Sequence, residues 1–311
     1  MDFCWVVGIF STAGTAKTRA VEEPERRKER MAGGRGKRAG RTGRLAKRSA
    51  GPETDPCPPG QSGGSYRPLT DAELGRIFGV SLDLLETLGV GETPPRLQAD
   101  LVAAGARDNG KGRILFPRSL VEDAINCAAK RFVLHGRDED RSIEVGGNSV
   151  HFGTGGAAVQ TLDLESGLYR PSTLQDLHDF TRLQDTLNNI SWFTRCCIAT
   201  DVADPFDLDI NTAYALVKNT TKPVATSFTL ASHVEPIVDL LDTVAGGPGQ
   251  FAERPFVKAH ISPVISPLRF GEDAVDVVYE CIKHNIPMSC ITAAQAGATA
   301  PATLAGFLAQ S

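Results

Sequence analysis

Three prolines spaced 32 residues apart constrain the fold of this chain more than any other feature of its sequence. Pro223, Pro255 and Pro287 each open a short apolar run. Proline is tolerated as the first residue of a strand because it need not donate a hydrogen bond to the sheet there. Residues 191–198 form another β-rich run one period earlier, and residues 158–163 form one a further period back. The spacing therefore predicts a repeating unit that contains one strand.

Amphipathic segments separate these runs and are predicted to be helices; they span residues 174–187, 208–218, 234–244 and 274–284. Strands that alternate with helices predict an α/β fold with a parallel sheet covered by helices. A repeat of this length is typical of a (β/α)8 barrel, or TIM barrel. Four units are clear, and residues 158–163 would supply a fifth. Periodicity alone leaves two architectures open, a small doubly wound sheet and a partial barrel.

The chain before the repeat divides into two parts. Residues 1–65 hold 13 Lys and Arg against 7 Asp and Glu, without apolar periodicity, which predicts a disordered basic tail. Residues 66–156 are predicted to form helices near 70–88, near 95–104 and from about 118 onward, followed by a small β-meander. The expected domains are therefore 1–65, 66–156 and 157–311, the last of which holds the β-α repeat.

Composition excludes several classes of protein. The apolar run at residues 3–10 is too short to cross a bilayer, and it lacks the preceding positive charges of a secretory signal. Seven cysteines without repeated spacing do not describe a disulfide framework, so we expect a cytoplasmic protein. Neither a metal-ligand spacing nor a dinucleotide-binding fingerprint is present. The body at residues 66–311 is acidic and contains no recognisable nucleic-acid-binding module, so neither nucleic acid nor membrane is expected as a partner.

Candidate site residues lie in the loops that follow the predicted strands, because parallel α/β folds form their sites at the carboxyl ends of strands. The candidates for a substrate pocket are Asp201, Thr229, His260, Ser262 and Gln295. Asp201 could orient a substrate or accept a proton, with helix capping as the alternative. His260 could instead be a hydrogen-bonded core histidine, and Gln295 could hold a ligand or brace its own loop.

Several segments in order resemble the trimethylamine methyltransferase (MttB-like) family of corrinoid-dependent amine methyltransferases. The most distinctive is Gly-Ala-Thr-Ala-Pro-Ala-Thr-Leu-Ala-Gly at residues 297–306. Residues 152–158, 169–173, 219–223 and 261–268 are similar to family segments in the same order. The resemblance covers about residues 67–311. It favours the barrel over the open sheet, and it implies that residues 157–311 are the first half of a TIM-type barrel, truncated.

The resemblance implies a methyltransferase that moves a methyl group from a methylated amine, such as trimethylamine or a betaine, to cobalt. The cobalt belongs to a corrinoid carried by a partner protein, as in the methylamine metabolism of methanogenesis, so this chain is expected to bind no cofactor itself. Family members continue well past residue 311. The resemblance therefore implies a C-terminally truncated fragment whose catalytic residues lie beyond that point. A homo-oligomer is compatible with this interpretation.

Other interpretations stay open. A lyase or aldolase barrel would need a Schiff-base lysine, for which Lys258 is the candidate, and an inactive truncated fragment is a further alternative. A methylated cation is commonly held over aromatic faces. Trp192, Phe228 and Tyr169 could supply such faces, although core packing is the favoured role for each.

Overall fold

The structure is a computed structural model that describes residue 55 and residues 57–311 except Ala293. Most of the predicted basic tail therefore lies outside the described residues. Its last part is structured, because β1 (Gln61–Ser62) pairs antiparallel with β7 (Ser149–Val150). The prediction of disorder up to residue 65 thus extends too far. Residues from Pro59 to Ser311 belong to one compact unit.

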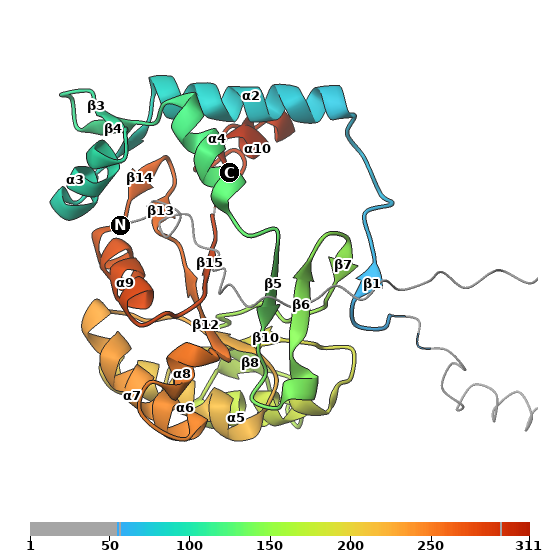
Figure 1. Cartoon of the computed structure of the whole chain (residues 1–311). Helices are drawn as coiled ribbons and strands as arrows, with labels where there is room; N and C mark the ends of the chain where they lie inside the picture. The colour runs from blue at the N-terminus through green and yellow to red at the C-terminus, as the bar shows by residue number, and fades with distance from the viewer. Residues whose placement is uncertain (1–54, 56, 293) are drawn as a thin grey trace, which may run out of the picture. The chain divides into compact units, whose positions relative to one another are not determined.

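Three helices open this unit where the sequence predicts them: α2 (Asp71–Thr87), α3 (Pro95–Ala103) and α4 (Arg118–Cys127). The start of α2 is fixed by a capping box. The Thr70 side chain accepts a hydrogen bond from the Glu73 backbone, and the Glu73 carboxylate accepts one from the Thr70 backbone. The last helix, α10 (Leu304–Gln310), packs against α2, so helices from the two ends of the unit lie side by side (Figure 1).

Short antiparallel elements join the first part of the unit to the repeat. One hairpin consists of β5 (Arg131–Leu134) and β6 (Ile143–Gly146), with a 3-10 turn, η2 (Glu139–Arg141), between them. A five-stranded sheet has the order β13-β14-β2-β4-β3. Its strands are β2 (Val90–Gly91), β3 (Arg107–Asp108), β4 (Arg113–Leu115), β13 (Val264–Ile265) and β14 (Arg269–Phe270). Because β13 and β14 follow the third repeat strand, this sheet ties residues 66–156 to residues 157–311.

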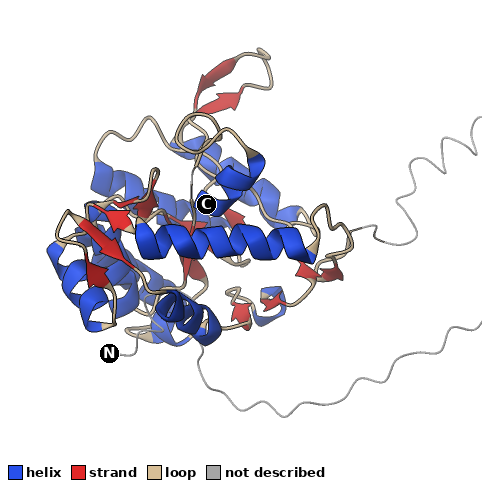
Figure 2. Cartoon of the chain, turned by 90° about the horizontal axis from the view of Figure 1, so that it is seen from above, coloured by secondary structure: helices blue, strands red, loops and turns tan. Residues whose placement is uncertain are grey.

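The repeat forms a four-stranded parallel sheet in the order β10-β11-β12-β15. These strands span Phe193–Thr194, Val224–Thr226, Val257–Ile261 and Met288–Cys290. Figure 2 shows that the strands of the chain are in general short beside its helices. The prolines stand just before strands as predicted. Two of them accept sheet hydrogen bonds through their carbonyls, from Phe193 N to Pro223 O (3.3 Å) and from Ala259 N to Pro287 O (2.7 Å).

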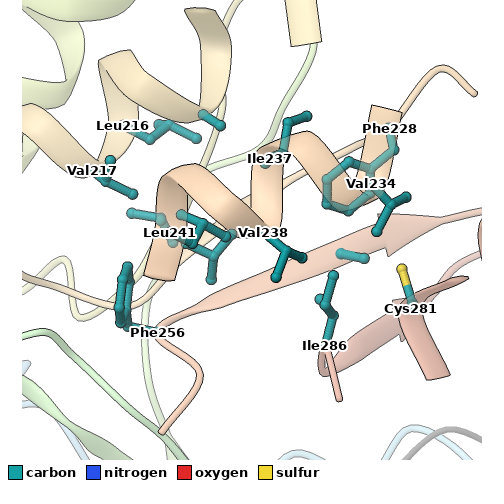
Figure 3. Close-up of a cluster of buried hydrophobic side chains, with 14 of the residues drawn as sticks. Leu216, Val217, Phe228, Val234, Ile237, Val238, Leu241, Phe256, Cys281 and Ile286 are labelled. Carbon is teal, nitrogen blue, oxygen red and sulfur yellow. The ribbon is translucent and has the colours of Figure 1, made fainter. Parts of the chain in front are cut away.

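Helices follow the strands as expected; they are α5 (Leu174–Thr186), α6 (Pro205–Asn219), α7 (Val234–Ala245), α8 (Gln250–Glu253) and α9 (Glu272–Lys283), with a 3-10 turn, η3 (Ala231–His233), before α7. The main core lies between these helices and one face of the parallel sheet (Figure 3). Ile237 and Leu241 of α7 meet Phe193 and Val257 there, all of them buried. Burial of this face is what holds the β-α units together.

The predicted fifth strand at residues 158–163 is wrong in position. Gln160–Leu162 is a strand, β8, but it pairs antiparallel with β9 (Tyr169–Pro171) in a hairpin. The parallel neighbour of β10 is instead the glycine-rich segment 153–158, through isolated bridges at its two ends. Glycine is required at residue 153 because a Cβ atom there would lie 2.4 Å from the Trp192 ring. The backbone can therefore approach β10 more closely than a chain with side chains could.

The described residues contain an open parallel sheet with its helices and no closed barrel. The α/β class is confirmed, and closure of the sheet into a TIM barrel stays a prediction, as does the division at residue 156. Within the same residues, no helix combines the length and the apolar character needed to cross a membrane.

Candidate functional site

The two faces of the parallel sheet differ, and the difference defines the candidate site. Along β12, Val257, Ala259 and Ile261 are buried in the main core, whereas Lys258 and His260 are half-buried. Because side chains alternate along a strand, Lys258 and His260 point to the face that the main core does not cover. Ser289 of β15 is the direct partner of His260 and shares that face. We call the face that bears these three residues the inner face.

Lys258 is a largely desolvated cation on the inner face. Its Nζ lies 4.3 Å from the centroid of the Trp192 ring, a cation–π contact. Burial lowers the pKa of Lys258. Among the described residues no carboxylate forms an ion pair with it. The sheet therefore keeps an amine on this face at a cost in desolvation.

His260 is shifted towards its neutral form. Burial is the main cause of its lowered pKa, and the positive charges of Lys258 and Arg195 act in the same direction. A neutral imidazole can accept a proton or a hydrogen bond near neutral pH. The inner face thus combines a neutral base with nearby cations, on the strand whose carboxyl end leads into the site loops.

A buried carboxylate organises the loop that follows β11. Asp209 of α6 is fully buried and accepts hydrogen bonds from the Thr229 backbone N–H (2.6 Å) and the Thr229 hydroxyl (2.9 Å). The His233 Nδ1 lies 2.8 Å from the same carboxylate and therefore carries the proton. His233 also packs edge-on against the Phe206 ring, with the centroids 5.3 Å apart. This Asp209 cluster fixes the loop and leaves Nε2 of His233 without a hydrogen-bond partner among the described residues.

The structure places the five predicted site residues in different roles. The exposed Asp201 accepts a hydrogen bond from Leu174 N (2.9 Å), so it helps to cap α5. Thr229 belongs to the Asp209 cluster, and His260 lies on the inner face. Ser262 is half-buried just after β12, without a hydrogen bond to another described residue. Their part in a reaction stays a prediction.

Gln295 braces its own loop through the backbone. Its carbonyl accepts hydrogen bonds from Ala298, Thr299 and Ala300, each 3.0 Å long, and its N–H donates to the Thr299 hydroxyl. The side chain is exposed. The backbone of Gln295 therefore braces the loop, as the alternative interpretation predicted. A role of its side chain in holding a ligand stays a prediction.

The three aromatic candidates for holding a cation lie in different surroundings. The Trp192 ring is already in cation–π contact with Lys258, and Phe228 is buried in the main core. Tyr169 is exposed on the β8–β9 hairpin. Within the described part of the chain, no three His, Cys, Asp or Glu side chains come together as a metal site. The described strands therefore offer cations and hydrogen-bonding groups rather than an aromatic box.

Sequence reasoning missed Asp209, His233 and Arg195. His233 stands in a strand-end loop that the sequence pattern identifies, so its position was visible although its partner was not. Asp209 lies in the second turn of α6 and resembles a solvated helix residue in sequence. The signal that was present is the absence of any cation three or four residues away to pair with it.

Comparison with known proteins identifies the family. Residues 35–311 match the model of the trimethylamine methyltransferase (MTTB) family. The chain is 30% identical over 241 residues to trimethylamine methyltransferase MttB of Desulfitobacterium hafniense, covering 77% of this chain and 48% of that protein. It is 26% identical over 244 residues to MttB of Methanosarcina thermophila, covering 77% of this chain and 50% of that protein.

A further relative has a different named substrate. Glycine betaine methyltransferase of Desulfitobacterium hafniense is 26% identical over 249 residues, which is 78% of this chain and 50% of that protein. The chain thus spans about half the length of the curated relatives that it matches. Since the family model covers most of its residues, the chain belongs to the trimethylamine methyltransferase family.

Proposed function

We propose that the complete protein transfers a methyl group from a methylated amine, trimethylamine or a quaternary amine such as glycine betaine, to the cobalt of a corrinoid. The corrinoid is carried by a partner protein, so this chain binds no cofactor of its own. The observation that carries the proposal is the family match over residues 35–311. It is supported by relatives that are named for both substrates.

The architecture is compatible with this reaction. We infer that the parallel sheet closes into a TIM barrel in the complete protein, with the inner face as its interior. The corrinoid supplies a nucleophilic metal centre that takes the methyl group, and it must approach the carboxyl ends of the strands, where barrel sites form.

The described half contributes positioning rather than the methyl-accepting group. His260, which is held neutral, and Ser289 can orient a substrate by hydrogen bonds. Lys258 places positive charge deeper in the sheet, where it would repel a methylated ammonium group. We infer that this charge keeps the amine towards the strand ends.

The test is methyl transfer by the full-length gene product. The protein is mixed with a corrinoid protein reduced to Co(I), and the Co(I) absorption is followed after addition of trimethylamine or glycine betaine. We expect the Co(I) spectrum to disappear only when enzyme and a methylated amine are both present. A mixture without the methyltransferase is the control.

Two results would reject the proposal. One is that no methylated amine consumes Co(I) in the presence of the full-length protein. The other is cleavage of a keto acid or sugar, with borohydride trapping of substrate on Lys258. The second result would establish the lyase or aldolase alternative, for which a lysine with a lowered pKa is the prerequisite.

A further inference from the structure

The carboxyl end of β10 carries a guanidinium that pairs with nothing in the part of the chain that the structure describes. Arg195 follows directly after Thr194, the last residue of β10, and its side chain is half-buried. Its backbone N–H donates to Ala225 O (3.1 Å), but its side chain makes no hydrogen bond or ion pair with a described residue. A guanidinium has five N–H donors, and leaving them unpaired away from water costs free energy. Packing alone therefore does not explain this residue.

The charges around Arg195 leave it short of an acceptor. Burial lowers the pKa of Arg195, and the negative charge of Asp209 only partly opposes this effect. The Asp209 carboxylate already accepts three hydrogen bonds, from Thr229 and His233, and it forms no ion pair with the guanidinium. The positive charge of Arg195 also contributes to the lowered pKa of His260. The donors of Arg195 are therefore available beside a candidate residue of the substrate pocket.

The sheet is present on both sides of Arg195. Strand β11 pairs with β10 on one side, and the glycine-rich segment 153–158 bridges to the same chain segment on the other. Ala157 N donates to the Arg195 carbonyl (3.1 Å), so the backbone of Arg195 is held by both neighbours. Neither neighbour supplies an acceptor for the guanidinium. An acceptor therefore has to come from beyond the strand ends, where parallel α/β folds bind their ligands.

We propose that Arg195 binds a carboxylate of the substrate, and that the substrate is a zwitterion with a methylated ammonium group and a carboxylate. This inference rests on the proposed function and chooses among its substrates. The planar guanidinium can form two parallel hydrogen bonds to a carboxylate. Trimethylamine brings no anionic group to Arg195. A betaine satisfies the guanidinium and is oriented by it, because the same charge repels the ammonium group and turns the methyl groups away.

The experiment compares glycine betaine with choline, a quaternary amine that lacks the carboxylate, as methyl donors for the full-length protein. Consumption of Co(I) on a reduced corrinoid protein gives kcat and KM for each donor. We expect the wild type to have a higher kcat/KM for glycine betaine than for choline or trimethylamine. Arg195→Gln should raise the KM for glycine betaine by roughly 100-fold, because it removes one partner of a charged, hydrogen-bonded pair. Calorimetric titration with glycine betaine, without Co(I), should show the same loss in the dissociation constant.

Two further variants separate the carboxylate contact from charge and from folding. Arg195→Lys keeps the positive charge but loses the planar fork, so it should recover only part of the affinity for glycine betaine. Arg182→Gln removes an exposed arginine of α5 that pairs with Asp179, and it should leave the KM unchanged. Melting temperatures of the ligand-free proteins show whether each variant folds as the wild type does.

Three results would overturn this inference and leave the proposed function intact. One is a higher kcat/KM for trimethylamine than for glycine betaine. Another is an Arg195→Gln variant that binds glycine betaine as tightly as the wild type. The third is an Arg195→Gln variant that melts earlier and loses activity with all donors equally, which would show that Arg195 pairs with a carboxylate of the protein itself. Consumption of Co(I) with no methylated amine at all would instead reject the proposed function, and the inference with it.

Discussion

The two faces of β12 show how differently one strand can be constrained. Val257, Ala259 and Ile261 lie on the covered face and pack against the helices. Lys258 and His260 lie on the inner face, half-buried, with pKa values that burial has lowered. Packing accounts fully for the residues of the covered face. The inner face keeps titratable groups at a cost in desolvation, so stability alone does not explain its composition.

The largest effect should come from removing bulk on the covered face. Phe193 of β10 is fully buried in the main core, and Phe193→Ala should lower the free energy of unfolding by about 3–5 kcal/mol. The measurement is denaturant unfolding followed by circular dichroism. Val133→Ala, on the exposed edge of the β5–β6 hairpin, is the control and should change stability by less than about 1 kcal/mol. Equal losses in the two variants would show that the covered face is not the core.

Removing the buried carboxylate of the Asp209 cluster tests whether a strand-end loop also depends on buried contacts for its stability. Asp209→Ala leaves the Thr229 and His233 donors unsatisfied and should cost about 3 kcal/mol. Asp207→Ala, an exposed residue of the same helix, should cost less than about 1 kcal/mol. Thermal unfolding of both variants is the measurement. If Asp209→Ala is as stable as the wild type, the carboxylate does not hold the loop.

Asp201 distinguishes a capping role from a substrate role. Its carboxylate accepts the Leu174 N–H at the start of α5, so Asp201→Ala should cost about 1 kcal/mol in stability. Asp201→Asn retains an acceptor oxygen and should recover most of that loss. Thermal unfolding measures the stability of each variant. Loss of methyl transfer by the full-length protein in both variants, with stability recovered in Asp201→Asn, would favour the substrate role.

The smallest effect concerns the pH dependence due to Lys258. Because its pKa is lowered in the folded state, the unfolded chain binds more protons below the usual lysine pKa. The contribution of Lys258 to stability therefore increases as the pH rises towards that value. Lys258→Met should remove this increase, by less than about 1 kcal/mol between about pH 7 and about pH 9.5. Unfolding at both pH values in wild type and variant measures it, and identical slopes would show that Lys258 is not desolvated.

Local signals in the sequence were sufficient for most elements. The capping box at Thr70 and Glu73 marks the start of α2. The three regularly spaced prolines mark the starts of β11, β12 and β15. The prediction for residues 158–163 was wrong because β-forming residues do not show which strand they will pair with. The strand there turns back on itself, while the glycine-rich segment before it takes the place beside β10.

The candidate site was predicted less well, for a related reason. Strand-end loops can be located from periodicity, which brought Thr229 and His260 into consideration. The Asp209–His233 pair joins residues 24 positions apart on two different elements, and only the packing of α6 against the loop brings them together. Likewise, nothing in the local sequence shows that the Trp192 ring is occupied by Lys258 rather than free for a substrate.

The central claim is that the inner face serves the reaction and the covered face serves stability. Its most direct test is His260→Ala against Ile261→Ala in the full-length protein, since these neighbours on β12 point to opposite faces. Methyl transfer to Co(I) and the melting temperature are measured for both. We predict that His260→Ala loses methyl transfer with little change in melting temperature. We predict that Ile261→Ala mainly lowers the melting temperature. Full methyl transfer by a folded His260→Ala variant would contradict the claim.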